Sequence, residues 1–175
     1  MGRLFAFLLA GVLVFVYPLF VYAENIGSTT AYDLPYPGLL PDSPFYFLKG
    51  IRDKVTGFFI SNPVKKASFD LLQADKRVAA SYMLLDKDKG KVKLAESTFS
   101  KGVNYFEDAL GKVTEAKKQG MDTRDTLRRL VTANLKHQEV IRNMEGMTGG
   151  TDKNEYLGLE ERVRKLGNTA RQIIQ

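Results

Sequence analysis

The sequence contains no cysteine, and only one of its 175 residues is a histidine. Without cysteine there can be no disulfide and no lipid-modified N-terminal cysteine, so the fold has to be stabilised by its apolar core. With one histidine and no Gly-x-Ser-x-Gly segment, a serine–histidine–acid catalytic triad is not credible. A glycine-rich phosphate-binding loop is also absent. We therefore expect neither an enzyme nor a cofactor.

The first part of the chain has almost no charge. After a single arginine, residues 4–23 carry no charged side chain, and Pro18 interrupts the apolar run shortly before Ala23. This order is typical of a signal peptide (residues 1–23), which we expect to be cleaved after Ala23 to leave Glu24 as the N-terminus. The alternative is an uncleaved anchor, because roughly twenty apolar residues can span a bilayer. The domain would then lie close to a membrane.

From Glu24 onwards the chain has 25 basic and 20 acidic side chains, a net charge of +5. A mild excess of this kind suits an anionic surface of the cell envelope, such as lipid headgroups, although it also serves solubility. Export would separate the protein from nucleic acid, which we do not expect as a partner. The expected partner is an unidentified protein or an anionic envelope surface.

Residues 24–43 form a proline-rich segment, here called the strap. Its second half is the start of the stretch "LPYPGLLPDSPFYFLKGIRDKV", which covers residues 34–55. Its prolines, Pro35, Pro37 and Pro41, fix φ and favour extended backbone in the residues before them. Asp42 or Ser43, followed by proline, is typical of a helix start. The strap is thus predicted to be extended and to end where the first helix begins.

Five segments after the strap carry apolar side chains at spacings of three and four, which indicates amphipathic helices. Their apolar positions include Leu48, Ile51, Val55 and Phe58; Val64, Ala67, Leu71, Leu72, Ala74, Val78, Met83 and Leu85; Val92, Ala95, Phe99, Gly102, Phe106, Ala109, Val113 and Ala116; Leu127, Leu130, Val131, Leu135, Ile141 and Met144; and Tyr156, Leu159, Val163, Leu166, Ala170 and Ile173. The second, fourth and fifth helices are predicted to start at Ser61-Asn62-Pro63, at Asp122 with Asp125, and at Asp152 with Glu155.

No segment after residue 23 shows the sustained alternation of a β-strand, so we predict an all-α fold. Short joints at Gly90 and Gly120 favour antiparallel neighbours, and the second and third helices should each have about 25 residues. One glycine costs only about 1 kcal/mol inside a helix, so a continuous rod through Gly90 is the alternative to a hairpin. The sequence predicts one bundle of about five long helices over residues 44–175, preceded by the strap.

The strap and the two segments after it resemble a family of exported bacterial and archaeal proteins that is known only as a domain of unknown function. The pattern is Pro-Gly-Leu-x-Pro-Asp-Ser-Pro-x-Tyr-x-Leu-Lys, and then Pro-x-Lys-Lys-Ala at the start of a helix. Its positions here are Pro37, Gly38, Leu39, Pro41, Asp42, Ser43, Pro44, Tyr46, Leu48 and Lys49, then Pro63, Lys65, Lys66 and Ala67. The resemblance is dense over residues 35–80. It implies an exported helical protein and brings no activity, cofactor or ligand.

Two roles for the strap follow from its residues. In the first, Leu39 and Leu40 seal one end of the bundle, while Phe45, Tyr46 and Leu48 hold the first helical turn against the core. In the second, the same region is a docking site with Tyr36 and Phe45 exposed to a partner. The first role is preferred. The candidate partner-binding residues are Tyr36, Leu39, Leu40, Phe45 and Tyr46.

The side chains that could carry chemistry are few. His137, Met144 and Met147 could form a copper-type metal site, because imidazole and thioether ligands suit that metal. Glu96-Ser97 resembles the catalytic pair of lytic transglycosylases, but lacks the rest of that motif. The segment "DKDKG" at residues 86–90 has too few acids for a calcium loop. We expect an exported, non-enzymatic interaction or structural module of the cell envelope, with an extracytoplasmic metal-binding bundle as the alternative.

Overall fold

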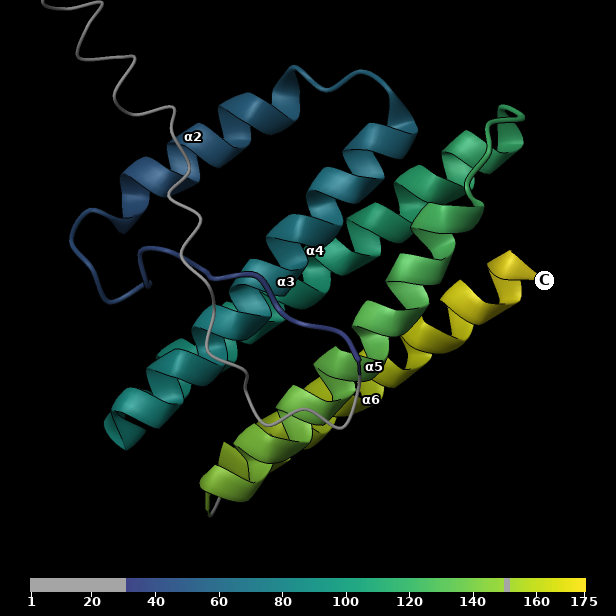
Figure 1. The fold of residues 1–175 in the computed structure, drawn as a ribbon. Coiled ribbons are helices and arrows are strands. Elements are labelled where there is room, and N and C mark those ends of the chain that lie inside the picture. Colours follow the sequence, from purple (N-terminus) through teal and green to yellow (C-terminus); the bar gives the residue numbers. More distant parts are fainter. Residues whose placement is uncertain (1–30, 150–151) are drawn as a thin grey trace, which may run out of the picture.

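The computed structural model describes residues 31–149 and 152–175, which form five α-helices and one turn of 3₁₀-helix (Figure 1). The predicted signal peptide, its cleavage site and the first residues of the strap lie outside the described residues. The elements are α2 (Tyr46–Phe58), α3 (Pro63–Lys87), η1 (Lys89–Lys91), α4 (Val92–Lys118), α5 (Arg124–Met147) and α6 (Asp152–Ile174). The described chain contains no strand, and the all-α prediction is confirmed. No helix in it is both long and apolar enough to cross a membrane.

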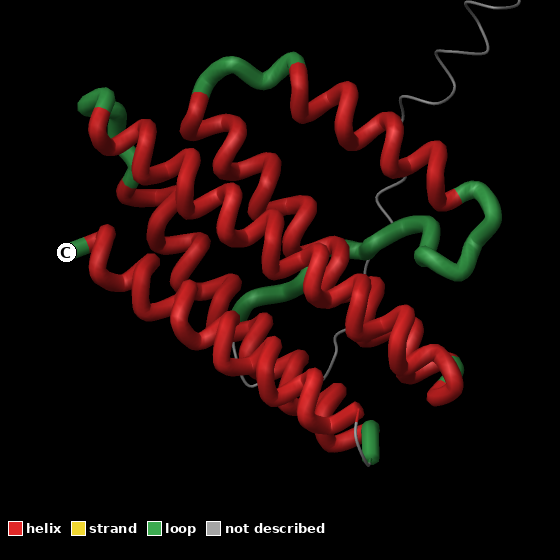
Figure 2. Tube along the Cα trace, turned by 180° about the vertical axis from the view of Figure 1, so that it is seen from behind, coloured by secondary structure: helices red, strands yellow, loops and turns green. Residues whose placement is uncertain are grey.

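The four long helices pack as two antiparallel pairs, α3 with α4 and α5 with α6 (Figure 1). Helix α3 ends at Lys87, and the Asp88 carboxylate accepts a hydrogen bond of 2.9 Å from the backbone N–H of Gly90. The hairpin prediction at Gly90 is therefore confirmed, and the chain does not continue as one rod. Figure 2 shows the same packing from behind, with α2 at the margin of the long helices.

The helix ends agree with the sequence pattern at some positions and differ at others. Asn62 accepts a hydrogen bond of 3.0 Å from Lys65 N–H with proline in the first position of α3, and Gly120 has a φ of 75° after α4. The start of α2 was predicted wrongly, because Ser43 and Pro44 lie in a turn and the helix begins at Tyr46. Asp122 accepts from Arg124 N–H instead of forming a capping box.

The core consists of two apolar clusters inside the four-helix arrangement, one around Phe99, Ile141 and Tyr156 and the other around Phe106 and Leu130. Most apolar positions predicted for α3 to α6 are buried in these clusters or packed against them. Leu72 and Leu135 are exceptions, because they lie on the outer sides of α3 and α5 and are exposed. The long helices therefore complete their core with little contribution from α2, whose main helical neighbour is α3.

Two glycines allow helices to approach closely. At Gly102 of α4, an added Cβ would lie 3.2 Å from the backbone oxygen of Ala74 in α3. At Gly167 of α6, it would overlap the side chain of Asn134 in α5, which donates a hydrogen bond of 2.8 Å to the Val163 carbonyl. Asn134 is buried, and its oxygen already accepts a bond from Gln138. The α5–α6 contact thus has no room for a methyl group at Gly167.

We predict opposite effects for two glycine-to-alanine substitutions in helix interiors. Gly167→Ala should lower the free energy of unfolding by about 1–3 kcal/mol, because the buried Asn134 has to move. Gly111→Ala should raise it by about 0.5–1 kcal/mol, because no atom lies within 4 Å and alanine has the higher helix propensity. Urea unfolding followed by circular dichroism measures both. Equal effects of the two substitutions would contradict the packing described for α5 and α6.

Candidate functional site

The exposed large apolar side chains are concentrated in one part of the described chain. Nine of thirteen lie within residues 36–59: Tyr36, Leu39, Phe45, Phe47, Leu48, Ile51, Val55, Phe58 and Phe59. Phe58 is 83% exposed and Phe59 is 76% exposed, values typical of charged surface residues rather than phenylalanine. We use the term apolar face for Phe47, Leu48, Ile51, Val55, Phe58 and Phe59, which lie on or directly after α2.

The apolar stripe of α2 was predicted correctly, but its orientation was not. Phe45 and Leu48 were expected to hold the first turn against the core, and they are 61% and 47% exposed. The side of α2 that faces the rest of the protein instead carries Lys49 and Asp53, which are 8% and 4% exposed. These two residues are four positions apart and therefore share one side of the helix. The helix buries its polar side and presents its apolar side to solvent.

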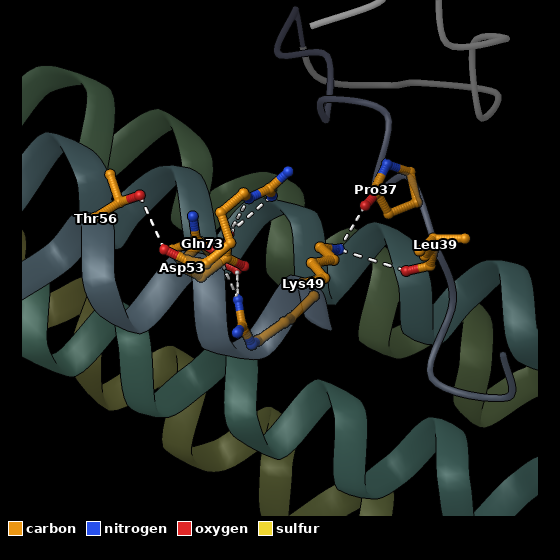
Figure 3. Close-up of polar contacts among 8 residues, drawn as sticks. Pro37, Leu39, Lys49, Asp53, Thr56 and Gln73 are labelled. Atoms are coloured by element: carbon orange, nitrogen blue, oxygen red, sulfur yellow. Dashed lines mark hydrogen bonds and ion pairs between the residues drawn. The ribbon is translucent and has the colours of Figure 1, made fainter. Parts of the chain in front are cut away.

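Lys49 connects α2 to the strap. Its ammonium group donates a hydrogen bond of 2.5 Å to the carbonyl of Pro37 and lies 3.5 Å from that of Leu39 (Figure 3). Burial lowers the pKa of Lys49 to about 8, although Asp53 acts in the opposite direction. The bond to Pro37 requires the side chain of Lys49 to point toward the strap, and so fixes the rotation of α2 about its axis.

Asp53 lies one turn after Lys49 on the same side of α2, and it is also buried. Its Oδ1 accepts hydrogen bonds of 2.8 and 3.2 Å from the Arg52 guanidinium, while its Oδ2 has no hydrogen-bond partner among the described residues. On α3, Arg77 is bonded to Gln73 and stacks 4.1 Å above the ring of Tyr105. Burial lowers the pKa of Lys76 in α3, and the Asp53 carboxylate acts in the opposite direction, so a charge on α2 interacts with one on α3.

The strap itself is fixed to the bundle by a buried polar cluster. The Tyr32 hydroxyl donates a hydrogen bond of 2.6 Å to Asp75 of α3, and the other oxygen of Asp75 lies 2.7 Å from Nε2 of His137 in α5. Burial, and then the Asp75 carboxylate, raise the pKa of Tyr32 well above its ordinary value. Leu34 is buried in the core and Leu40 packs against it. The strap thus covers the bundle through Tyr32, Leu34 and Leu40, and the expectation that Leu39 would be buried was wrong, since it is 48% exposed.

Two of the five candidate partner-binding residues are partly buried and three are exposed. Leu40 and Tyr46 are partly covered, whereas Tyr36, Leu39 and Phe45 face solvent. Phe47 and Phe59 were not among the candidates predicted from the sequence. The sequence does show that Lys49 and Asp53 lie on one side of α2 and the apolar stripe on the other. It does not show which of these two sides faces the bundle, so the exposure of Phe47 and Phe59 could not be predicted from it.

Two of the predicted metal ligands, His137 and Met144, each contact a different residue of α3. His137 faces Asp75 and packs edge-on against Phe106, whereas the sulfur of Met144 accepts a hydrogen bond of 3.5 Å from Ser81. The two residues are seven positions apart on α5, a rise of roughly 10 Å along the helix axis. No group of three or more histidine, aspartate and glutamate side chains suited to a metal occurs in the described residues. The copper site with Met147 stays a prediction, and titration of the protein with copper by calorimetry tests it.

A shallow groove of about 630 Å³ lies between α4 and α6, far along the sequence from the apolar face. Leu110, Leu166 and Ile173 are among its apolar lining residues, and Glu107 and Lys118 are among its charged ones. Glu96, from the motif that resembles transglycosylases, does not line this groove. The two threonine hydroxyls in its lining, of Thr114 and Thr169, donate hydrogen bonds to backbone carbonyls of their own helices.

Residues 38–149 match the family described as Domain of unknown function (DUF5667). No curated protein and no solved structure matches the chain significantly. The matched range includes α2 to α5 and begins within the strap, so it contains the apolar face and both residues that orient it. A description of unknown function assigns no ligand to that face, and its role has to be inferred from its physical properties.

We predict that Lys49→Met changes the pH dependence of stability. The folded wild type holds the pKa of Lys49 at about 8, compared with 10.5 for an ordinary lysine. Between these values the unfolded chain binds more protons than the folded protein, so wild-type stability rises with pH relative to the variant and is lowest below pH 8. Urea unfolding followed by circular dichroism on either side of this window measures the difference. If the free energies of unfolding of wild type and variant differed by the same amount below pH 8 and above pH 10.5, the burial of the Lys49 ammonium group would be contradicted.

Proposed function

The chain belongs to the DUF5667 family of unknown function, and we propose that it is an exported, non-enzymatic interaction module of the cell envelope. The observation that carries the proposal is the apolar face of α2 together with the exposed residues of the strap. Contiguous apolar surface on a soluble domain marks a site of interaction with a protein or a membrane. The four long helices act as the support, and α2 acts as the binding element.

The orientation of α2 favours binding over a structural role. A helix that stabilises a bundle buries its stripe, and burial of one phenylalanine or leucine contributes roughly 1.5–3 kcal/mol. Helix α2 forgoes this contribution at Leu48, Ile51 and Val55, which are 47–55% exposed. Contact with a partner removes the same side chains from water, so the free energy not used in folding becomes available for binding.

The N-terminal part of the sequence supports an envelope location. Residues 4–23 carry no charge and end in a segment suited to signal peptidase, and the domain after them has no cysteine that would need a reducing compartment. An exported domain with an exposed apolar surface meets its partners at the membrane or the cell wall. Both the expected protein partner and the anionic envelope surface lie there.

We predict that capture of a protein partner depends on the apolar face. In the native host, crosslinking and affinity purification with the wild type should yield proteins that the double variant Phe58→Ser/Phe59→Ser loses. The matched control is Leu135→Ser/Leu157→Ser, which removes two exposed apolar side chains from α5 and α6. The first variant should keep the wild-type melting temperature, because Phe58 and Phe59 are 83% and 76% exposed. The control should melt at a slightly lower temperature, because Leu135 and Leu157 are partly covered and lie inside helices, so capture is compared at a temperature well below both transitions. Capture that is equal in the two variants would contradict a protein partner at the apolar face.

We also predict that the exported protein begins at Glu24. Mass spectrometry of the chain purified from the envelope fraction of the native host should give the mass of residues 24–175. An intact N-terminus in the membrane fraction would instead establish the anchored form, and a chain found only in the cytoplasm would overturn the proposed location. This result does not depend on what the apolar face binds.

A further inference from the structure

We propose that the apolar face of α2 binds the interfacial layer of an anionic phospholipid bilayer, with the helix lying along the membrane surface. The inference rests on the proposed function, because it identifies the surface that the module contacts. Three independent observations carry it: the arrangement of side chains around α2, the distribution of charge along the chain, and the apolar segment that precedes the domain.

The arrangement around α2 is that of an interfacial helix. At roughly 100° per residue, Phe47, Ile51 and Val55 point away from the buried pair Lys49 and Asp53. Arg52 and Lys54, both exposed, lie on the two margins of the apolar face. A helix bound at a membrane surface inserts its apolar side among the acyl chains and extends basic side chains from its margins to the headgroups. Helix α2 shows this order.

The net positive charge of the protein is localised at the same place. Residues 44–66 contain five basic side chains and one acidic one, a net charge of +4, whereas all other residues from Glu24 to the end together contribute +1. Lys49 and Asp53 are both buried on the side opposite to the apolar face and Lys66 is paired with Asp70, so the exposed basic side chains are Arg52, Lys54 and Lys65. Anionic headgroups attract each nearby basic residue by about 1 kcal/mol. The charge therefore complements an anionic membrane and repels a second copy of the same face.

The sequence also brings α2 near a membrane. Residues 4–23 form an uncharged apolar segment of the length that spans a bilayer, and only 22 residues separate it from Tyr46. The strap is fixed to α3 at Tyr32 and to α2 at Pro37, and α2 is the first helix of the described residues. During export, and permanently if the segment is retained, the domain that carries the apolar face lies beside a bilayer.

The absence of tryptophan from the chain allows a direct test. The predicted exported chain, residues 24–175, carrying Phe58→Trp is mixed with phosphatidylcholine vesicles with and without phosphatidylglycerol. Its tryptophan emission should shift to shorter wavelength and be quenched by lipids with brominated acyl chains, more strongly when phosphatidylglycerol is present. The matched control is Leu157→Trp on α6, which is 44% exposed in wild type and should show neither effect.

A change of charge in the same reporter tests the electrostatic part. Arg52→Gln/Lys54→Glu with Phe58→Trp should reduce quenching in phosphatidylglycerol vesicles to the level in phosphatidylcholine alone. Glutamine at position 52 keeps an N–H donor for the buried Asp53 carboxylate, no residue of the apolar face other than the reporter is changed, and circular dichroism verifies the helix content. Quenching that stays the same after the change of charge overturns the role of the basic margins and with it the proposal.

Two other outcomes overturn the inference and leave the proposed function standing. If Trp at position 58 is shielded only as the ratio of protein to lipid rises, equally in both vesicle types, the face binds a second copy. If it stays accessible to iodide and unquenched in both, the face does not contact lipid, while partner capture through Phe58 and Phe59 remains the test of the interaction module. Export is tested separately, by the mass-spectrometric search for a chain that begins at Glu24. Its outcome does not depend on the fluorescence result.

Discussion

The buried carboxylate of Asp75 is the contact on which the arrangement of the strap and of α2 depends. It lies between His137 of α5 and Tyr32 of the strap, and so joins three parts of the chain that are far apart in sequence. A buried carboxylate costs less free energy when both of its oxygens accept hydrogen bonds, and here each oxygen has one close partner, at 2.6 and 2.7 Å. Because the strap is held there, the Pro37 carbonyl is in place for Lys49, and Lys49 in turn sets the rotation of α2.

The consequence is a helix whose apolar side is turned outward. Burying Lys49 and Asp53 costs free energy, and Asp53 keeps one oxygen without a hydrogen bond among the described residues. A bundle under selection for stability alone would bury Ile51 and Val55 instead. The described structure thus separates two tasks: the four long helices supply a complete core, and α2 is presented with its apolar face available and its charge concentrated at the margins of that face.

The fold was predictable because the long helices follow local rules. Asn62 before proline, Gly120 after a helix, and apolar spacing of three and four in α4 each act over one or two turns, and each was found as expected. The helix starts near Ser43 and Asp122 were less predictable, because polar residues there have competing turn geometries. Leu72 was predicted to belong to the buried stripe of α3 and is exposed. The spacing of apolar residues shows where a stripe lies on a helix, but it does not show how many residues on either side of the stripe are buried.

For the candidate site, the sequence by itself determined that α2 is amphipathic, that basic residues cluster around it, and that an apolar segment precedes the domain. Only the tertiary structure decided which side of α2 faces solvent. The physical reason is that the apolar and polar sides were both suited to burial, and the choice depended on partners at Pro37 and Asp75, which periodicity cannot place. The cluster of Tyr32, Asp75 and His137 was likewise invisible in sequence, because its members are 43 and 62 residues apart and meet only when strap, α3 and α5 are packed.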